Sequence, residues 1–148
     1  MNMELEVISR LPKIRQQRPP LLFVHGAFSA AWCWDEYFLP YFAKHGYPAY
    51  AVSLRGHGGS DGNEKLQFAS LADYVADVAQ VSQQLEQPPI MVGHSLGGMV
   101  VQKYLEARHP ATAAVLMASV PPTGLWYPSC YLALTNPFLF IQLNLMQS

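Results

Sequence analysis

Short apolar runs alternate with amphipathic stretches along the first 118 residues. The apolar runs, which are typical of buried strands, cover residues 21–24, 47–54, 90–92 and 113–118. Between them, apolar residues recur at helical spacing over 30–43, 70–86 and 97–108. This strict alternation predicts an α/β fold: a mostly parallel sheet with helices on both faces and right-handed crossovers.

The helix predicted over residues 70–86 has the clearest two-sided pattern. Its apolar residues fall on one face, and Asp73, Asp77 and Gln84 are expected on the opposite, solvent face. Ser70 and Asp73 have the spacing of an N-terminal capping box. In the helix over 30–43, Pro40 is expected to bend or divide the helix, because proline lacks a backbone N–H.

The two ends of the chain differ from the alternating middle. Residues 1–20 are expected to form an N-terminal arm and connector, residues 21–120 the core, and residues 121–148 an apolar segment. No Asp, Glu, Lys or Arg follows Arg108, and the tail is rich in Leu, Phe, Tyr and Pro. Pro128 and Pro137 interrupt this tail, so no transmembrane segment is predicted, since a span needs ~20 uninterrupted apolar residues.

The composition excludes several classes of protein. The net charge of −1, with 13% charged residues, offers no basic patch for nucleic acid. Glu4 and Glu6 interrupt what would be the apolar core of a signal peptide. Cys33 and Cys130 have no metal-ligand spacing, and no disulfide is expected between them. We therefore expect a cytoplasmic protein without a metal site.

The strongest chemical signal is Gly93-His94-Ser95-Leu96-Gly97, a G-x-S-x-G sequence between an apolar run and a helical pattern. At such a strand-turn-helix junction the serine is pushed out at the end of the sheet. The two glycines keep side chains away from the tight backbone. His25-Gly26-Ala27, the glycine-rich loop 55–62 and Ser119 also follow predicted strands. Because carboxyl ends of parallel strands meet at one edge, these segments should cluster around Ser95.

Three motifs in this order resemble the N-terminal part of the α/β-hydrolase fold superfamily, in particular serine esterases and lipases. They are Leu22-Phe23-Val24-His25-Gly26-Ala27, Leu54-Arg55-Gly56-His57-Gly58 and Val92-Gly93-His94-Ser95-Leu96-Gly97-Gly98. Ala31-Trp32-Cys33-Trp34 is also typical of some esterase-like branches. The similarity covers about residues 20–120.

This resemblance implies a role for each matching residue. Ser95 takes the position of the nucleophile. The backbone N–H groups of Ala27 and Leu96 would form an oxyanion hole, and no cofactor is implied. Side chains expected to line an apolar acyl pocket are Phe28, Trp34 and Met99. Residues expected to support the motifs are His25, Gly26, Gly93, His94 and Gly97.

The catalytic acid and histidine of the superfamily follow later strands, and here the sequence departs from the pattern. After Ser95 the only carboxylate is Glu106 and the only histidine is His109. At ~1.5 Å rise per residue, Glu106 would lie roughly 15 Å along the helix, too far from Ser95. The sheet is therefore expected to be truncated before its C-terminal strands.

Other histidines are weak substitutes for the missing base. His94 is expected to point away from Ser95 into the packing between sheet and helix. His25 is expected to fix the oxyanion loop by hydrogen bonds within the protein. His57 lies in a loop at the correct edge and is the best surrogate, although a role in stabilising its own loop is the simpler interpretation.

The sequence thus favours a serine hydrolase that acts on a carboxylic ester or similar small apolar acyl substrate through a Ser95 acyl-enzyme. The apolar tail resembles the start of a lid, and its exposed faces could mediate association. Two alternatives stay open. One is a truncated, non-catalytic relative that binds a ligand or partner, including a partner chain that supplies the missing residues. The other is lyase, acyltransferase or cofactor-free peroxidase chemistry on the same fold.

Overall fold

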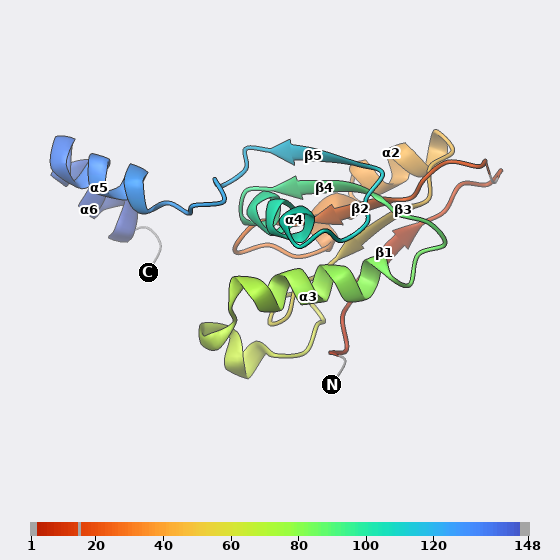
Figure 1. The fold of residues 1–148 in the computed structure, drawn as a ribbon, viewed down its shortest axis with the longest axis horizontal. Helices are drawn as coiled ribbons and strands as arrows, with labels where there is room; N and C mark the ends of the chain where they lie inside the picture. Colours follow the sequence, from red (N-terminus) through yellow and green to blue (C-terminus); the bar gives the residue numbers. More distant parts are fainter. Residues whose placement is uncertain (1–2, 15, 146–148) are drawn as a thin grey trace.

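The computed structural model describes residues 3–14 and 16–145, without the side chains of residues 65, 67, 126 and 143–145. Within these residues, five strands form one sheet in the order β1-β3-β2-β4-β5 (Figure 1). The strands are β1 (Val7–Arg10), β2 (Leu21–Val24), β3 (Ala49–Val52), β4 (Ile90–His94) and β5 (Ala113–Met117). β2 to β5 are parallel and β1 runs antiparallel to β3, which confirms the predicted α/β fold with a mostly parallel sheet.

β3 is shorter than the apolar run that predicted it, because its neighbour ends first. Val24, the last residue of β2, pairs with Val52. Beyond this point Ser53 and Leu54 remain fully buried but have no parallel partner on that side. They are therefore free to bind the loop that leaves β2.

Helices cover both faces of the sheet. α3 (Leu71–Ser82) and α4 (Leu96–Glu106) pack on one face, and α1 (Trp32–Asp35) and α2 (Phe38–Lys44) on the other (Figure 1). Alternate residues of a central strand pack against the helices on opposite faces of the sheet. In β2, Leu22 and Val24 join the α3–α4 cluster, whereas Leu21 and Phe23 join the α1–α2 cluster. This arrangement explains why β2 is apolar throughout.

One helix prediction needs correction, one is confirmed, and one short helix was not predicted. The helix over 30–43 does divide, but at Glu36–Tyr37 rather than at Pro40. Pro40 lies in the first turn of α2, where its missing N–H costs no hydrogen bond. The Ser70–Asp73 capping box is present at the start of α3. A short 3₁₀ helix, η1 (Asn63–Phe68), was not predicted.

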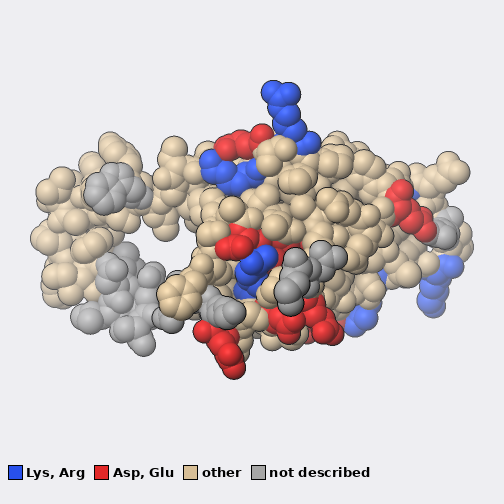
Figure 2. Space-filling view, turned by 60° about the horizontal axis from the view of Figure 1, so that its bottom comes forward, with Lys and Arg blue, Asp and Glu red and all other residues tan. Residues whose placement is uncertain are grey.

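The C-terminal segment stands apart from the sheet. α5 (Trp126–Thr135) and α6 (Pro137–Leu145) pack on each other and extend away from β5 (Figure 1). Pro128 lies in the first turn of α5 and Pro137 opens α6, so both prolines occupy positions that a helix tolerates. Figure 2 shows this lobe as a surface without charged residues. None of the helices in the described part of the chain is long and apolar enough to cross a membrane.

Candidate active site

Ser95 connects β4 to α4 through a strained turn. Its backbone has φ 52° and ψ −116°, an unusual conformation for a residue with a side chain. Two hydrogen bonds hold it from the side of β5: the Ser95 N–H donates to the Met117 carbonyl (3.0 Å), and the Val120 N–H donates to the Ser95 carbonyl (3.1 Å). Strain of this kind persists only where the surroundings enforce it, and it is concentrated at functional sites.

The glycines on either side of Ser95 allow a very close approach of backbone segments. A Cβ on Gly93 would lie 2.5 Å from the Gly97 carbonyl oxygen. A Cβ on Gly97 would overlap the carbonyl oxygens of Val24 and His25 at the end of β2. α4 can therefore begin directly against β2 only because residue 97 has no side chain.

Replacing Gly97 with alanine is expected to lower the free energy of unfolding by about 2–3 kcal/mol, because backbone atoms must move to admit the methyl group. Chemical denaturation measures the change. Gly124→Ala is the control: no atom lies within 4 Å of the added Cβ, and only its positive φ of 78° opposes the substitution. An equal loss of stability in the two variants would contradict the steric explanation.

The loop after β2 lies directly beside Ser95. A Cβ on Gly26 would be 3.1 Å from the Ser95 Cβ and 3.1 Å from His94 Nδ1. Ala27 and Phe28 follow at the surface, and Phe28 has a left-handed φ of 59°. The structure therefore brings the His25–Ala27 motif and the serine turn together at the carboxyl edge of the sheet. Within the described part of the chain, no hydrogen bond from the Ala27 or Leu96 amide is found, so both are available to a ligand.

His25 is fully buried and uses both ring nitrogens. The Leu54 N–H donates to Nε2 (3.0 Å), so the proton resides on Nδ1, which donates to the Gly26 carbonyl (2.7 Å). The pKa of His25 is lowered from 6.5 to about 4, chiefly by burial and to a smaller extent by neighbouring His57. The hydrogen bond to Gly26 and the charge of Glu6 oppose this decrease. His25 is thus a neutral residue that holds the loop.

His94 does not lie where the sequence predicted. It is exposed at the site edge, with Nδ1 beside Gly26, rather than packed between sheet and helix. The cause is that His94 is the last residue of β4, beyond the end of β2, so no strand residue covers it on that side. His57 is half-buried and donates through Nδ1 to the Arg55 carbonyl (3.0 Å), and its ring lies tilted against that of His25 with the centroids 5.0 Å apart.

Glu106 and His109 follow Ser95 in the chain and could in principle complete a catalytic triad, but neither lies near Ser95. Glu106 forms an exposed ion pair with Lys103 (2.7 Å) in the last turn of α4. His109 stacks on Tyr104, with ring centroids 4.7 Å apart, beyond the same helix end. Among the described residues, no side chain forms a hydrogen bond with Ser95 Oγ.

Of the three predicted pocket residues, Trp34 is misplaced. Its side chain is 4% exposed and packs on Phe23 (4.9 Å between ring centroids) and Phe38 in the core beneath α1 and α2. Helical spacing could not show which side of the short helix α1 faces the sheet. Phe28 is 87% exposed beside the serine turn, and Met99 is half-buried in the first turn of α4.

An ion-pair cluster at the same edge was missed. Arg55, three residues beyond the end of β3, binds Asp77 through its backbone N–H and its guanidinium, and binds Asp73 through Nη1 (2.7 Å). Asp77 is 1% exposed, so its prediction as a solvent-facing residue is wrong. The signal was present in the sequence: Asp77 is three residues after Tyr74 and four before Val81, on the apolar face of α3. Hydrogen bonding to Asp77 raises the pKa of Arg55.

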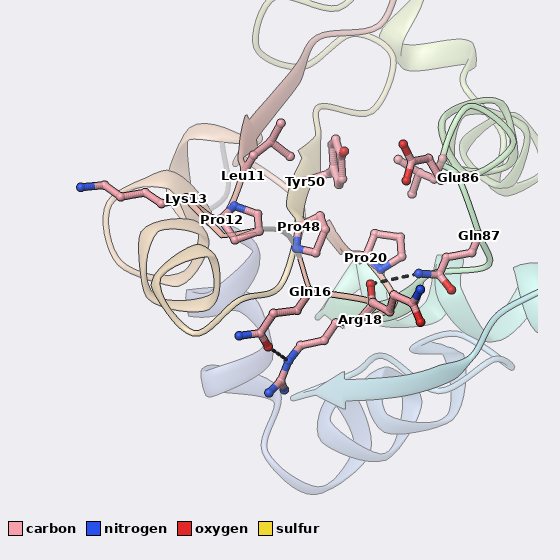
Figure 3. Close-up of a pocket in the computed structure, with 12 residues that line it drawn as sticks. Leu11, Pro12, Lys13, Gln16, Arg18, Pro20, Pro48, Tyr50, Glu86 and Gln87 are labelled. Carbon is pink, nitrogen blue, oxygen red and sulfur yellow. Dashed lines mark hydrogen bonds between the residues drawn. The ribbon is translucent and has the colours of Figure 1, made fainter.

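A groove of about 710 Å³ lies elsewhere in the molecule. Figure 3 shows Pro20 and Pro48, which precede β2 and β3, beside Tyr50, Arg18 and Gln87. These residues mark the amino ends of the strands, so the groove is at the opposite edge from Ser95. It is not the acyl pocket predicted from the sequence. The described residues contain no group of three or more potential ligands that could hold a metal ion.

Comparison with known proteins agrees with this geometry. A profile described as "Alpha/beta hydrolase family" matches residues 21–145. A non-heme chloroperoxidase of Streptomyces lividans is 37% identical over 106 residues, which are 70% of this chain and 37% of the relative. A pyrethroid hydrolase of Sphingobium wenxiniae is 32% identical over 97 residues, 66% of this chain and 34% of the relative.

Solved structures show the same fold. The crystal structure of a probable hydrolytic enzyme from Pseudomonas aeruginosa superimposes with a TM-score of 0.68 at 24% identity. The match covers 78% of this chain and 37% of that one. The chain spans about a third of the length of the curated relatives it matches. From the profile match and these identities together, the chain belongs to the alpha/beta hydrolase family.

Proposed function

We propose that Ser95 is the nucleophile of an acyl-transfer reaction on a carboxylic ester or similar acyl substrate. Its hydroxyl oxygen would attack the substrate carbonyl, expel the alcohol and form an acyl-enzyme, which water would then hydrolyse. The observation that carries the proposal is the positive φ of Ser95 beside Gly26. This strained turn holds the serine at the sheet edge against a loop with a free amide. Such chemistry needs no metal or cofactor.

The amides of Ala27 and Leu96 are the proposed oxyanion hole. Ala27 follows Gly26 in the loop beside Ser95, and Leu96 opens α4, where unpaired N–H groups and the helix dipole favour negative charge. Donors of this kind stabilise the charge that develops on the carbonyl oxygen, and loss of one typically raises the barrier by about 3–4 kcal/mol. Phe28 and Met99 are the proposed apolar contacts of a small or medium acyl group.

A fluorophosphonate probe tests the nucleophile directly, because it phosphonylates only an activated serine. We expect intact-mass spectrometry to show one adduct on the parent chain, located at Ser95 by peptide mapping, and none on Ser95→Ala. Ser119→Ala is the matched control, since Ser119 also follows a strand at this edge but is engaged by Gln102 (2.8 Å). A folded parent chain without an adduct would refute the proposal.

Two further variants test whether Glu106 or His109 of this chain helps to activate Ser95. Glu106→Gln and His109→Ala should label at the parent rate, because both side chains lie at the far end of α4. A loss of labelling in either variant would show that one of them acts on Ser95.

A second reaction is supported by the chloroperoxidase relative. An acyl-enzyme at Ser95 can be attacked by hydrogen peroxide in place of water, which yields a peroxy acid and regenerates the serine. The two reactions share the first step, so their ratio is measured by adding peroxide during ester turnover and quantifying acid and peroxy acid. The proposal of perhydrolysis fails if acid remains the only product.

We further propose that the charge-free α5–α6 lobe mediates association. Leu134 is 85% exposed and Phe138 is 79% exposed, and their side chains lose almost no packing when replaced. Leu134→Lys with Phe138→Glu is expected to reduce concentration-dependent self-association in sedimentation velocity, because charges disfavour apolar contact. Phe68→Lys, at a 76% exposed aromatic residue of η1, should leave association unchanged.

We also propose that the protein is located in the cytoplasm. Cys33 and Cys130 are both free and half-buried, as expected for a protein in a reducing compartment.

A further inference from the structure

The loop that leaves β2 is bound at both ends by two consecutive residues of the neighbouring strand's extension. The Leu54 N–H donates to the ring of His25, where the loop starts, and Ser53 Oγ accepts the N–H of Ala31, where the loop ends (2.9 Å). We propose that Ser53 is a positioning residue: together with the Leu54 amide, it fixes the loop and hence the direction of the Ala27 amide toward the substrate oxygen. This inference rests on the proposed function of Ser95.

The start of the loop determines which way the Ala27 amide points. The Gly26 carbonyl and the Ala27 N–H belong to one trans peptide unit, in which C=O and N–H point in opposite directions. His25 Nδ1 holds the Gly26 carbonyl (2.7 Å). The Ala27 N–H must therefore point away from the His25 ring, while Gly26 itself lies against Ser95.

The other end of the loop depends on the direction of one hydroxyl group. Ser53 Oγ–H donates to the Glu6 carboxylate, so a lone pair of the same oxygen is left to accept from the Ala31 amide. The backbone of Glu6 is itself fixed by two hydrogen bonds. The Ser53 N–H donates to the Glu6 carbonyl (2.9 Å), and the Glu6 N–H donates to Ser60 Oγ (2.9 Å). The N-terminal arm thereby sets the end of the loop.

The middle of the loop has little packing of its own. Ala27 is exposed and Phe28 is 87% exposed, so no buried side chain anchors the loop between Gly26 and Ser29. Its backbone position therefore depends on the two bound ends. Loss of the Ser53 hydroxyl would leave the buried Ala31 amide without its acceptor, loosen this end of the loop and let the Ala27 amide shift away from the substrate oxygen, a displacement to which oxyanion stabilisation is very sensitive.

Ser53→Ala tests the proposal against Ser82→Ala. Both hydroxyls are buried and hydrogen-bonded, but Ser82 binds Tyr104 (2.9 Å) between α3 and α4. We expect both variants to lose thermal stability. Only Ser53→Ala should slow fluorophosphonate labelling of Ser95, by roughly tenfold, which is less than the loss of a whole oxyanion donor. Only Ser53→Ala should speed hydrogen exchange of the Ala31 amide, by roughly tenfold.

Two variants at Glu6 test the same link without altering a buried residue. Glu6→Gln keeps an oxygen that can accept from Ser53 and should label at nearly the parent rate, whereas Glu6→Ala should follow Ser53→Ala. The proposal is overturned if Ser53→Ala and Glu6→Ala both keep the parent exchange rate at Ala31. It is also overturned if both label like the parent. If the parent chain itself is not labelled, the proposed nucleophilic role of Ser95 is refuted. Hydrogen exchange at the Ala31 amide then still decides whether Ser53 fixes the loop.

Discussion

Replacement of Asp77 by alanine is expected to lower the free energy of unfolding by about 3–5 kcal/mol, the range for breaking one partner of a buried ion pair. Asp77 is 1% exposed and accepts from the Arg55 backbone N–H (2.9 Å) as well as from its guanidinium. Its loss leaves the Arg55 guanidinium half-buried, without its main partner, against a face of α3 that is otherwise apolar. It also releases the start of the glycine-rich loop. Urea denaturation monitored by tryptophan fluorescence measures the effect.

Asp73 provides the matched comparison, because it binds the same guanidinium from an exposed position. Asp73→Ala removes one ion pair and the capping box, yet water can replace both contacts. We expect a clearly smaller loss than for Asp77→Ala. If the two variants were equally unstable, burial would not be the reason for the importance of Asp77.

Lowering the pH from 7 to 4 is expected to remove about 3 kcal/mol of stability through His25 alone. The pKa of this side chain is about 4 in the folded protein and 6.5 in the unfolded chain. Between these values the unfolded chain binds more protons than the folded one, so stability falls as the pH decreases. The stabilisation is complete above pH 6.5 and is lost as the pH falls toward 4. The charged or titratable neighbours of the ring are His57, 5.0 Å away between centroids, and Glu6.

His25→Gln separates this effect from other acid-sensitive groups. The variant should be less stable than the parent at pH 7, since it replaces a buried ring. Its stability should then fall less steeply than that of the parent between pH 6.5 and 4.5, as measured by denaturation at each pH. Parallel pH curves for the two proteins would refute the role assigned to His25.

The sequence predicted the strands well because β2 and β4 are short, apolar and buried on both faces, which leaves few alternatives. It also located the serine turn, since glycine on both sides of a serine after a strand is a strong local signal. The Ser70–Asp73 cap followed from local spacing for the same reason. Such features depend on residues close together in the chain.

The errors concern contacts between distant segments. The resemblance to esterases placed Trp34 in an acyl pocket, but only the position of α1 against β2 shows that the ring faces Phe23. Asp77 appeared polar and therefore exposed, because its partner Arg55 is 22 residues away. The position of His94 depended on β2 ending one residue earlier than β4 in the sheet register. Ser53 gave no signal at all, because its role arises from three separate chain segments.

The pairing of β2 with β4 has a consequence for folding. These strands are adjacent in the sheet, but the chain between them contains β3 and α3, and Gly26 meets Ser95 across 69 residues. Closing so long a loop is entropically slow, and the contact cannot precede synthesis of β4. The loop and the serine turn should therefore meet late, close to the rate-limiting barrier for folding. On the ribosome, the β2–β3 pair must wait for β4 with one edge uncovered, which makes this the interval in which the nascent chain is most exposed to misassociation.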